Sequence, residues 1–138
     1  MNALVVGSSD IDIFVKPKNT SSFVESQKTV TFTLGDKIPI DVHAMTLGGN
    51  AANVSVGLRR LGADMSLYTY FGTDILSRQI KESLEKEKIN LVSNSALGEN
   101  TSLSLIFDFS SDRIIFSHHE ERNHSFDAEK ASGFEALY

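Results

Sequence analysis

The stretch GGNAANVSVGLRRLGA, residues 48–63, decides the fold of this 138-residue chain. Apolar residues recur in it at helical spacing and predict one buried helix face: Ala51, Val54, Leu58 and Leu61. We expect the helix to run from about Asn50 to Leu61, with Asn50 as its N-cap and Gly62 just after its end. Unpaired N–H groups and the positive end of the helix dipole would then lie directly after a pair of glycines.

This helix start has the composition of a ligand site. Gly48 and Gly49 lack a Cβ, so the backbone can approach a bound molecule closely. Asn50 and Asn53 lie three residues apart in the first turn and can reach the same side. Amide side chains both donate and accept hydrogen bonds, as sugar hydroxyls require. An ordinary capped helix after a glycine turn explains the same spacing, and from spacing alone both interpretations stay open.

The rest of the chain alternates strands with helices. We expect a buried strand at 3–6, a loop at 19–28, a hairpin at 29–42 around Gly35-Asp36, a strand at 65–71, a helix at 75–88, a hairpin at 102–117 and a helix beginning near 125–127. Strands that alternate with helices predict an α/β fold with a parallel sheet. The two hairpins interrupt that order and favour a small antiparallel flap at the edge of the sheet.

Asp10 and Asp12 follow the first expected strand. Ligands of open α/β sheets bind beyond the carboxyl ends of the strands, and a carboxylate can accept hydrogen bonds from two hydroxyl groups of a polyol. A loop Asx turn or a pair of exposed acids is the alternative. A metal site is disfavoured, because nothing nearby in the sequence completes a cage of oxygen ligands.

Composition narrows the function class. The net charge is −5, there is no cysteine, and no apolar run approaches the ~20 residues that a membrane span needs. These features predict a soluble, cytoplasmic protein and disfavour nucleic-acid and anionic-membrane partners. The segment His118 to His124 contains histidines and acids, but we interpret it as a solvated turn and predict no metal site there.

Residues 48–63, together with Tyr70-Phe71-Gly72-Thr73-Asp74 and the opening Val5 to Asp12, resemble the first signature of PfkB/ribokinase-family carbohydrate kinases. The resemblance implies a ribokinase-like α/β fold: a parallel sheet flanked by helices, with a small antiparallel β lid. It implies lid strands at about 12–16, 29–46 and 102–117, and it identifies the whole of 1–138 as the N-terminal half of such a kinase domain.

The resemblance also implies roles for single residues. Asp12 would accept hydrogen bonds from sugar hydroxyls with Asp10 beside it, Gly48 and Gly49 would bring main chain up to the sugar, and Asn53 would bind a hydroxyl. Asn50 stands where ribokinases have lysine, which leaves the identity of the sugar open. The catalytic base aspartate is expected beyond Tyr138, so no catalytic residue is assigned within the chain. Phe71 to Asp74 only superficially resembles the catalytic motif, and we expect it to cap the second helix.

The function implied is ATP-dependent phosphorylation of a sugar hydroxyl, with Mg²⁺ as the metal and closure of the lid to exclude water. Lid sheets in this family often pair between subunits, which implies a homodimer through the lid. A non-catalytic sugar-binding or regulatory module derived from such a kinase is the alternative. A dinucleotide-binding domain needs G-x-G-x-x-G after the first strand, which Gly7 to Asp12 lacks.

Overall fold

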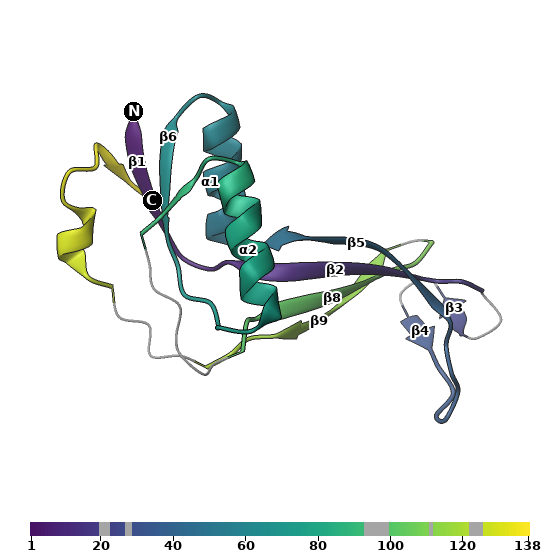
Figure 1. Cartoon of the computed structure of the whole chain (residues 1–138). Coiled ribbons are helices and arrows are strands. Elements are labelled where there is room, and N and C mark those ends of the chain that lie inside the picture. Colours follow the sequence, from purple (N-terminus) through teal and green to yellow (C-terminus); the bar gives the residue numbers. More distant parts are fainter. Residues whose placement is uncertain (20–22, 27–28, 93–99, 111, 122–125) are drawn as a thin grey trace.

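The computed structural model describes residues 1–19, 23–26, 29–92, 100–110, 112–121 and 126–138, which form two sheets, a separate short hairpin and two α-helices (Figure 1). The elements, in chain order, are β1 (Asn2–Val6), β2 (Asp10–Pro17), β3 (Val24–Ser26), β4 (Thr29–Thr31), β5 (Ile40–Gly48), α1 (Asn50–Arg60), β6 (Asp64–Tyr68), α2 (Ile75–Lys86), β7 (Asn90–Leu91), β8 (Leu103–Asp108), β9 (Arg113–His118), the 3₁₀ turn η2 (Ala128–Ala131) and β10 (Ala136–Leu137). None of the described helices is long and apolar enough to cross a membrane.

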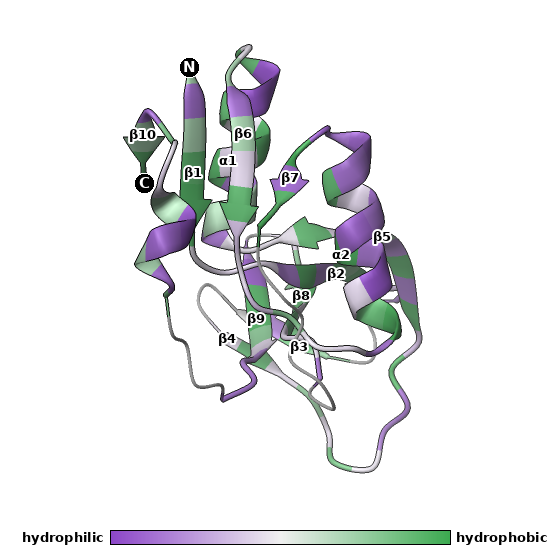
Figure 2. Cartoon of the chain, turned by 60° about the vertical axis from the view of Figure 1, so that its left-hand side comes forward, coloured by the Kyte–Doolittle hydropathy of each residue, from purple (hydrophilic) through white to green (hydrophobic). Residues whose placement is uncertain are grey.

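The main sheet has the strand order β10-β1-β6-β7, and all of its pairs are parallel. This confirms the parallel sheet expected from the alternation of strands and helices. Leu4 and Val5 are fully buried, as predicted for a strand with both faces covered, and Figure 2 shows mostly hydrophobic residues along β1. The helix expected from 125–127 onward is wrong: Asp127 caps only the single turn η2, and the chain then enters β10 beside β1.

Both α-helices pack on the same apolar cluster as β1 and β6. The inward residues of α1 are Ala51, Ala52 and Ser55, while Val54 and Leu58 are only partly buried at the edge of the cluster. Small inward side chains let α1 approach the sheet closely, and the Ser55 hydroxyl donates to the Ala51 carbonyl at 2.8 Å. Leu61 was expected on the buried face but is 85% exposed, because the helix ends at Arg60 and Leu61 is its C-cap.

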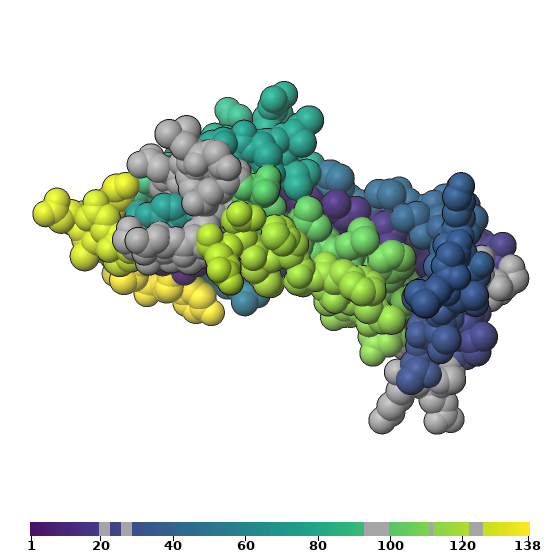
Figure 3. Space-filling view, turned by 90° about the horizontal axis from the view of Figure 1, so that it is seen from below, coloured from purple at the N-terminus to yellow at the C-terminus, as the bar shows by residue number. Residues whose placement is uncertain are grey.

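The second sheet, here called the lid, extends away from the main sheet (Figures 1 and 3). Its order is β5-β2-β8-β9, antiparallel except for the parallel pair β2–β8. The expected hairpin between β8 and β9 is confirmed, whereas the hairpin at 29–42 is wrong. β4 pairs back with β3, a strand inside the expected loop, and β5 pairs with β2. β5 lies at the edge of the lid, and Pro39 precedes it with its carbonyl accepting from the Lys18 N–H at 2.9 Å.

Phenylalanines close the far end of the lid. The ring of Phe109 lies 5.2 Å from that of Phe23 and 6.3 Å from that of Phe32, so the β3–β4 hairpin is held against the lid by aromatic contacts. Phe107 continues this cluster on β8, and Val15 of β2 is fully buried. The far end of the lid is therefore packed by aromatic side chains, whereas Ile11 of β2, nearer its base, joins the core beneath the main sheet.

Candidate functional site

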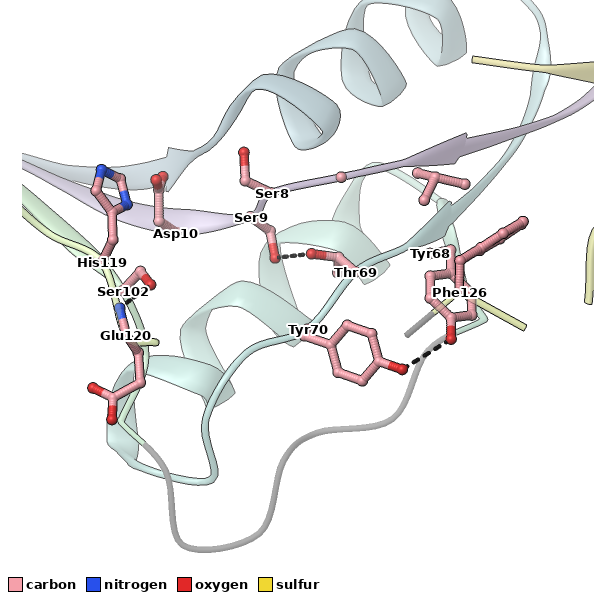
Figure 4. A pocket seen from close by; sticks show the side chains of 12 residues that line it. Ser8, Ser9, Asp10, Tyr68, Thr69, Tyr70, Ser102, His119, Glu120 and Phe126 are labelled. Atoms are coloured by element: carbon pink, nitrogen blue, oxygen red, sulfur yellow. Dashed lines mark hydrogen bonds between the residues drawn. The ribbon is translucent and has the colours of Figure 1, made fainter. Parts of the chain in front are cut away.

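A cavity of about 370 Å³ opens where the carboxyl ends of β1 and β6 meet the base of the lid (Figure 4). Its floor is formed by the segment between β1 and β2 and by the residues that end β6. Within this floor the hydroxyl oxygens of Ser9 and Thr69 lie 2.9 Å apart in a buried contact. The contact ties the start of the lid to the main sheet, so the cavity lies at the junction of the two sheets.

Asp10, the first residue of β2, reaches into this cavity. The residue is only 7% exposed, and its Oδ1 is fully buried with no hydrogen-bond partner among the described residues. Burial raises the pKa of Asp10, the neighbouring Asp12 carboxylate raises it further, and His119 opposes both effects. A buried carboxylate oxygen without a donor costs free energy, and no donor among the described residues offsets that cost.

Asp12 and Gly48 lie next to Asp10 because of the lid register. Side chains alternate along a strand, so Asp10 and Asp12 point to the same face of β2. Gly48 on β5 is paired with Asp10, and a Cβ on Gly48 would lie 2.5 Å from an Asp12 carboxylate oxygen. Burial raises the pKa of Asp12, while a hydrogen bond from the Ser104 side chain opposes that shift. Gly48 thus leaves the space that the two carboxylates occupy.

Gly49 has a packing role. It is the N-cap of α1 with φ at 91°, and a Cβ there would lie 2.5 Å from the Ser8 carbonyl oxygen. The expected cap by Asn50 is therefore wrong, because α1 begins one residue after a glycine that must touch the backbone between β1 and β2. Two of the first-turn donors are bonded to Ser8: Ser8 Oγ accepts from the Asn50 N–H at 3.2 Å, and the Ser8 carbonyl accepts from the Ala52 N–H at 3.3 Å.

Asn50 and Asn53 are both exposed in the first turn of α1. Neither lines the cavity, and the same is true of Asp12, Gly48 and Gly49. Of the residues predicted from sequence, the structure thus brings Asp10, Asp12 and Gly48 into contact and leaves the two asparagines on the neighbouring helix end. Their roles toward a sugar stay predictions.

The opposite wall of the cavity contains residues that the sequence did not indicate. His119, just after β9, lies beside Asp10, and the Glu120 N–H donates to Ser102 Oγ at 3.1 Å (Figure 4). Tyr70 and Phe126 line the other end. Only the pairing of β9 with β8, and of β8 with β2, places residue 119 near residue 10. No local pattern in the sequence carries that information, and Arg122 to His124 lie outside the described residues.

Asp74 performs the capping role predicted for it. Its Oδ1 accepts from the Ser77 N–H at 3.0 Å at the start of α2. It also accepts from both the backbone N–H and the hydroxyl of Thr101, at 2.9 and 2.6 Å, which joins α2 to the segment leading into β8. Burial raises the pKa of Asp74, but these hydrogen bonds outweigh it and the net pKa is lowered. Asp74 therefore has a structural role in this part of the chain.

Comparison with known proteins now identifies the family. The model of the pfkB family of carbohydrate kinases matches residues 21–136. The chain belongs to this family. The comparison with curated proteins gave no match.

Solved structures of pfkB-type kinases share the fold. A carbohydrate kinase from Agrobacterium tumefaciens superimposes with a TM-score of 0.68 at 17% identity, covering 86% of this chain and 36% of that one. A microbiome-derived acarbose kinase gives 0.65 at 20% identity, covering 88% and 37%. A ribokinase from Cryptococcus neoformans in complex with ADP gives 0.64 at 22% identity, covering 86% and 34%. The chain thus spans little more than a third of each of these kinases, and the fold class predicted from sequence is confirmed.

Members of the pfkB family are carbohydrate kinases, and the fold implies a nucleotide and a metal ion. Within the described ranges, no group of three acidic or histidine side chains lies close enough to hold a metal ion. Helix N-termini are common phosphate sites, but at α1 the N–H groups of Asn50 and Ala52 are already bonded to Ser8. We therefore derive no catalytic step through ATP or Mg²⁺ from the residues of this chain.

Proposed function

We propose that the protein containing this chain is a cytoplasmic sugar kinase that transfers the γ-phosphoryl group of ATP to a sugar hydroxyl, and that this chain supplies the sugar-binding residues. One observation carries the proposal: Asp10 lines the cavity with a carboxylate whose buried Oδ1 has no hydrogen-bond partner among the described residues, and a second carboxylate follows on the same strand. The family and the fold support the reaction class.

In this proposal Asp10 and Asp12 accept hydrogen bonds from sugar hydroxyls and fix the orientation of the ring. Hydrogen bonds to charged groups contribute about 1.5–3 kcal/mol each, which is enough to select one orientation. Gly48 and Gly49 keep the backbone of β5 and α1 close to the carboxylates, and Asn50 and Asn53 reach the sugar from the first turn of α1. The lid covers the sugar and excludes water from the reaction.

We also propose that the lid forms a homodimer contact. Large apolar side chains are exposed on its outer strands, where they would be covered by a second copy: Val42, Met45, Ile115 and Phe116. Sedimentation of the full-length protein over a range of concentrations would detect the dimer. A purely monomeric protein at all concentrations would overturn this part of the proposal.

The test of function is an ATP-dependent phosphorylation screen of the full-length protein against a panel of sugars. We expect one sugar, or a small set of related sugars, to be phosphorylated. Asp12→Ala should raise the sugar concentration needed for half-saturation at least about tenfold, whereas Asp36→Ala, at an exposed acid in the turn before β5, should leave it unchanged. Sugar binding without phosphorylation would favour the non-catalytic module instead, and absence of both would overturn the proposal.

A further inference from the structure

A row of polar side chains crosses the lid at the level of Asp12. Asp12 on β2 is paired with Thr46 on β5 and with Ser104 on β8. Ser104 is in turn paired with Ser117 on β9. Paired residues of neighbouring strands point to the same face, so this polar row spans all four strands of the lid (Figure 1). The next row along the same face is apolar: Ala44, Phe14, Ile106 and Ile115.

Ser104 lies at the centre of a directed chain of hydrogen bonds. The residue is 8% exposed, and a buried hydroxyl needs hydrogen-bond partners. Ser104 donates to the Asp12 carboxylate, and its Oγ lies 3.4 Å from Oγ of Ser117. An ionised carboxylate only accepts, and a hydroxyl has a single hydrogen, so Ser117 must donate to Ser104. The hydrogen bonds therefore run from Ser117 through Ser104 to Asp12.

The Asp12 carboxylate is confined from both neighbouring strands. On the β5 side, a Cβ on Gly48 would lie 2.5 Å from Oδ2 of Asp12, so the carboxylate fills the space that the glycine leaves. On the β8 side, the Ser104 hydroxyl holds it. Burial raises the pKa of Asp12, and the hydrogen bond from Ser104 opposes that rise, so Ser104 favours the ionised form. Oδ1 of Asp10, by contrast, has no partner among the described residues.

Resting on the function proposed above, we propose that Ser104 is a positioning residue for sugar binding: its hydroxyl holds the Asp12 carboxylate in the orientation that accepts hydrogen bonds from the sugar, and Ser117 orients Ser104. An ionised carboxylate has about four acceptor positions, so one bond from Ser104 leaves the others for sugar hydroxyls. A carboxylate that is already held in place loses less conformational entropy when the sugar binds.

The experiment is calorimetric titration of the full-length protein with D-ribose, D-glucose, D-galactose and D-fructose. For each sugar that binds the wild type, Ser104→Ala should weaken binding about three- to tenfold at neutral pH, the effect of one lost hydrogen bond. Ser104→Thr keeps the hydroxyl and should restore the affinity. Ser117→Ala, at an exposed position, should weaken binding about two- to threefold. Ser83→Ala is the control, because it removes a hydroxyl that donates to the Gln79 carbonyl at 2.8 Å on α2, and it should leave the affinity unchanged.

The pH dependence of sugar affinity separates positioning from a loss of packing. Affinity should fall in acid as Asp12 is protonated. In Ser104→Ala this fall should begin at higher pH, because the pKa of Asp12 rises when the donor is lost. Ser104→Thr should follow the wild-type profile. Every variant keeps the other charged and titratable side chains of this face, among them Asp10, Lys16, His43, Asp108, Arg113 and His119.

The outcomes separate the two proposals. Wild-type affinity and an unshifted pH profile in Ser104→Ala would overturn the positioning role and leave the sugar kinase standing. A loss of affinity that Ser104→Thr does not restore, or that Ser83→Ala shares, would also overturn it, because the hydroxyl would then not be the cause. If Ser104→Ala does not fold, Ser117→Ala decides, and wild-type affinity in that variant would overturn the role. Failure of the wild type to bind any of the sugars would overturn both proposals.

Discussion

Asp10→Asn should make the protein more stable and less able to bind sugar. The substitution keeps the shape of a side chain that is 7% exposed, but it removes a buried charge whose Oδ1 has no partner among the described residues. An unpaired buried acceptor costs about 1–3 kcal/mol, and the amide still has to be desolvated, so we expect a net gain of about 1–2 kcal/mol in unfolding free energy at neutral pH. Loss of the charged acceptor should weaken sugar binding by about 1.5–3 kcal/mol, roughly 10- to 150-fold.

The pH dependence distinguishes this reasoning from a general packing effect. Burial and Asp12 raise the pKa of Asp10 in the folded state, so the folded protein holds this proton more tightly than the unfolded chain does. The stability linked to Asp10 is therefore fully present below the unfolded pKa and is lost as pH rises through the raised one. The stability advantage of Asp10→Asn over the wild type should therefore appear as pH rises through the raised pKa of Asp10, and it should vanish in acid.

Urea unfolding of wild type and Asp10→Asn across pH would measure the difference, with Asp36→Asn as the exposed control. A stability difference that does not change with pH, or a less stable variant, would refute the reasoning. So would unchanged sugar affinity, because the buried carboxylate would then have no ligand to receive.

Other substitutions test separate parts of the account. Asp12→Ala should raise the sugar dissociation constant at least about tenfold by calorimetry with an unchanged melting temperature, and unchanged affinity would mean that the sugar lies elsewhere. Gly48→Ala should weaken sugar binding, because the added Cβ would displace the Asp12 carboxylate. Gly49→Ala should instead destabilise the fold by about 1–3 kcal/mol, because a φ of 91° is strained for alanine and the Cβ would meet backbone atoms. Equal effects of the two substitutions on the melting temperature would contradict this distinction. Asp74→Ala should cost about 1–2 kcal/mol through the lost cap of α2. The pKa of Asp74 is lowered in the folded protein, so its contribution to stability is present above the unfolded pKa and is lost as pH falls through the folded pKa. A loss of stability in Asp74→Ala that is equally large in acid would argue against this role of the ionised carboxylate.

Local sequence patterns predicted the regular elements well and their partners less well. Apolar spacing placed both α-helices within two residues of their observed ends, since helical contacts are local. The residues at 29–42 do alternate, and the Asp36 N–H donates to the Thr33 carbonyl at 3.3 Å in the expected turn. Yet the two flanking strands pair elsewhere, because alternation states which face of a strand is apolar and not which strand lies beside it.

At the site, too, local sequence patterns predicted some residues, whereas contacts between residues distant in sequence were not predicted. Asp10 and Asp12 were predicted from their place after the first strand, and they lie where ligands of α/β sheets bind. The satisfied donors of α1 were not predicted, because Ser8 is distant in sequence and reaches the helix only through the close approach at Gly49. His119 and Phe126 were missed for a related reason: they reach the cavity through the β2–β8–β9 pairing and through the contact of Phe126 with Tyr68.

The most direct test of the central claim is a crystal structure of the full-length protein with the sugar that it phosphorylates. We predict a sugar hydroxyl oxygen within about 3 Å of the Asp10 carboxylate, with a second hydroxyl on the Asp12 carboxylate. A sugar bound at another surface, with the Asp10 carboxylate contacting only protein atoms, would contradict the assignment of this chain as the sugar-binding half of the kinase.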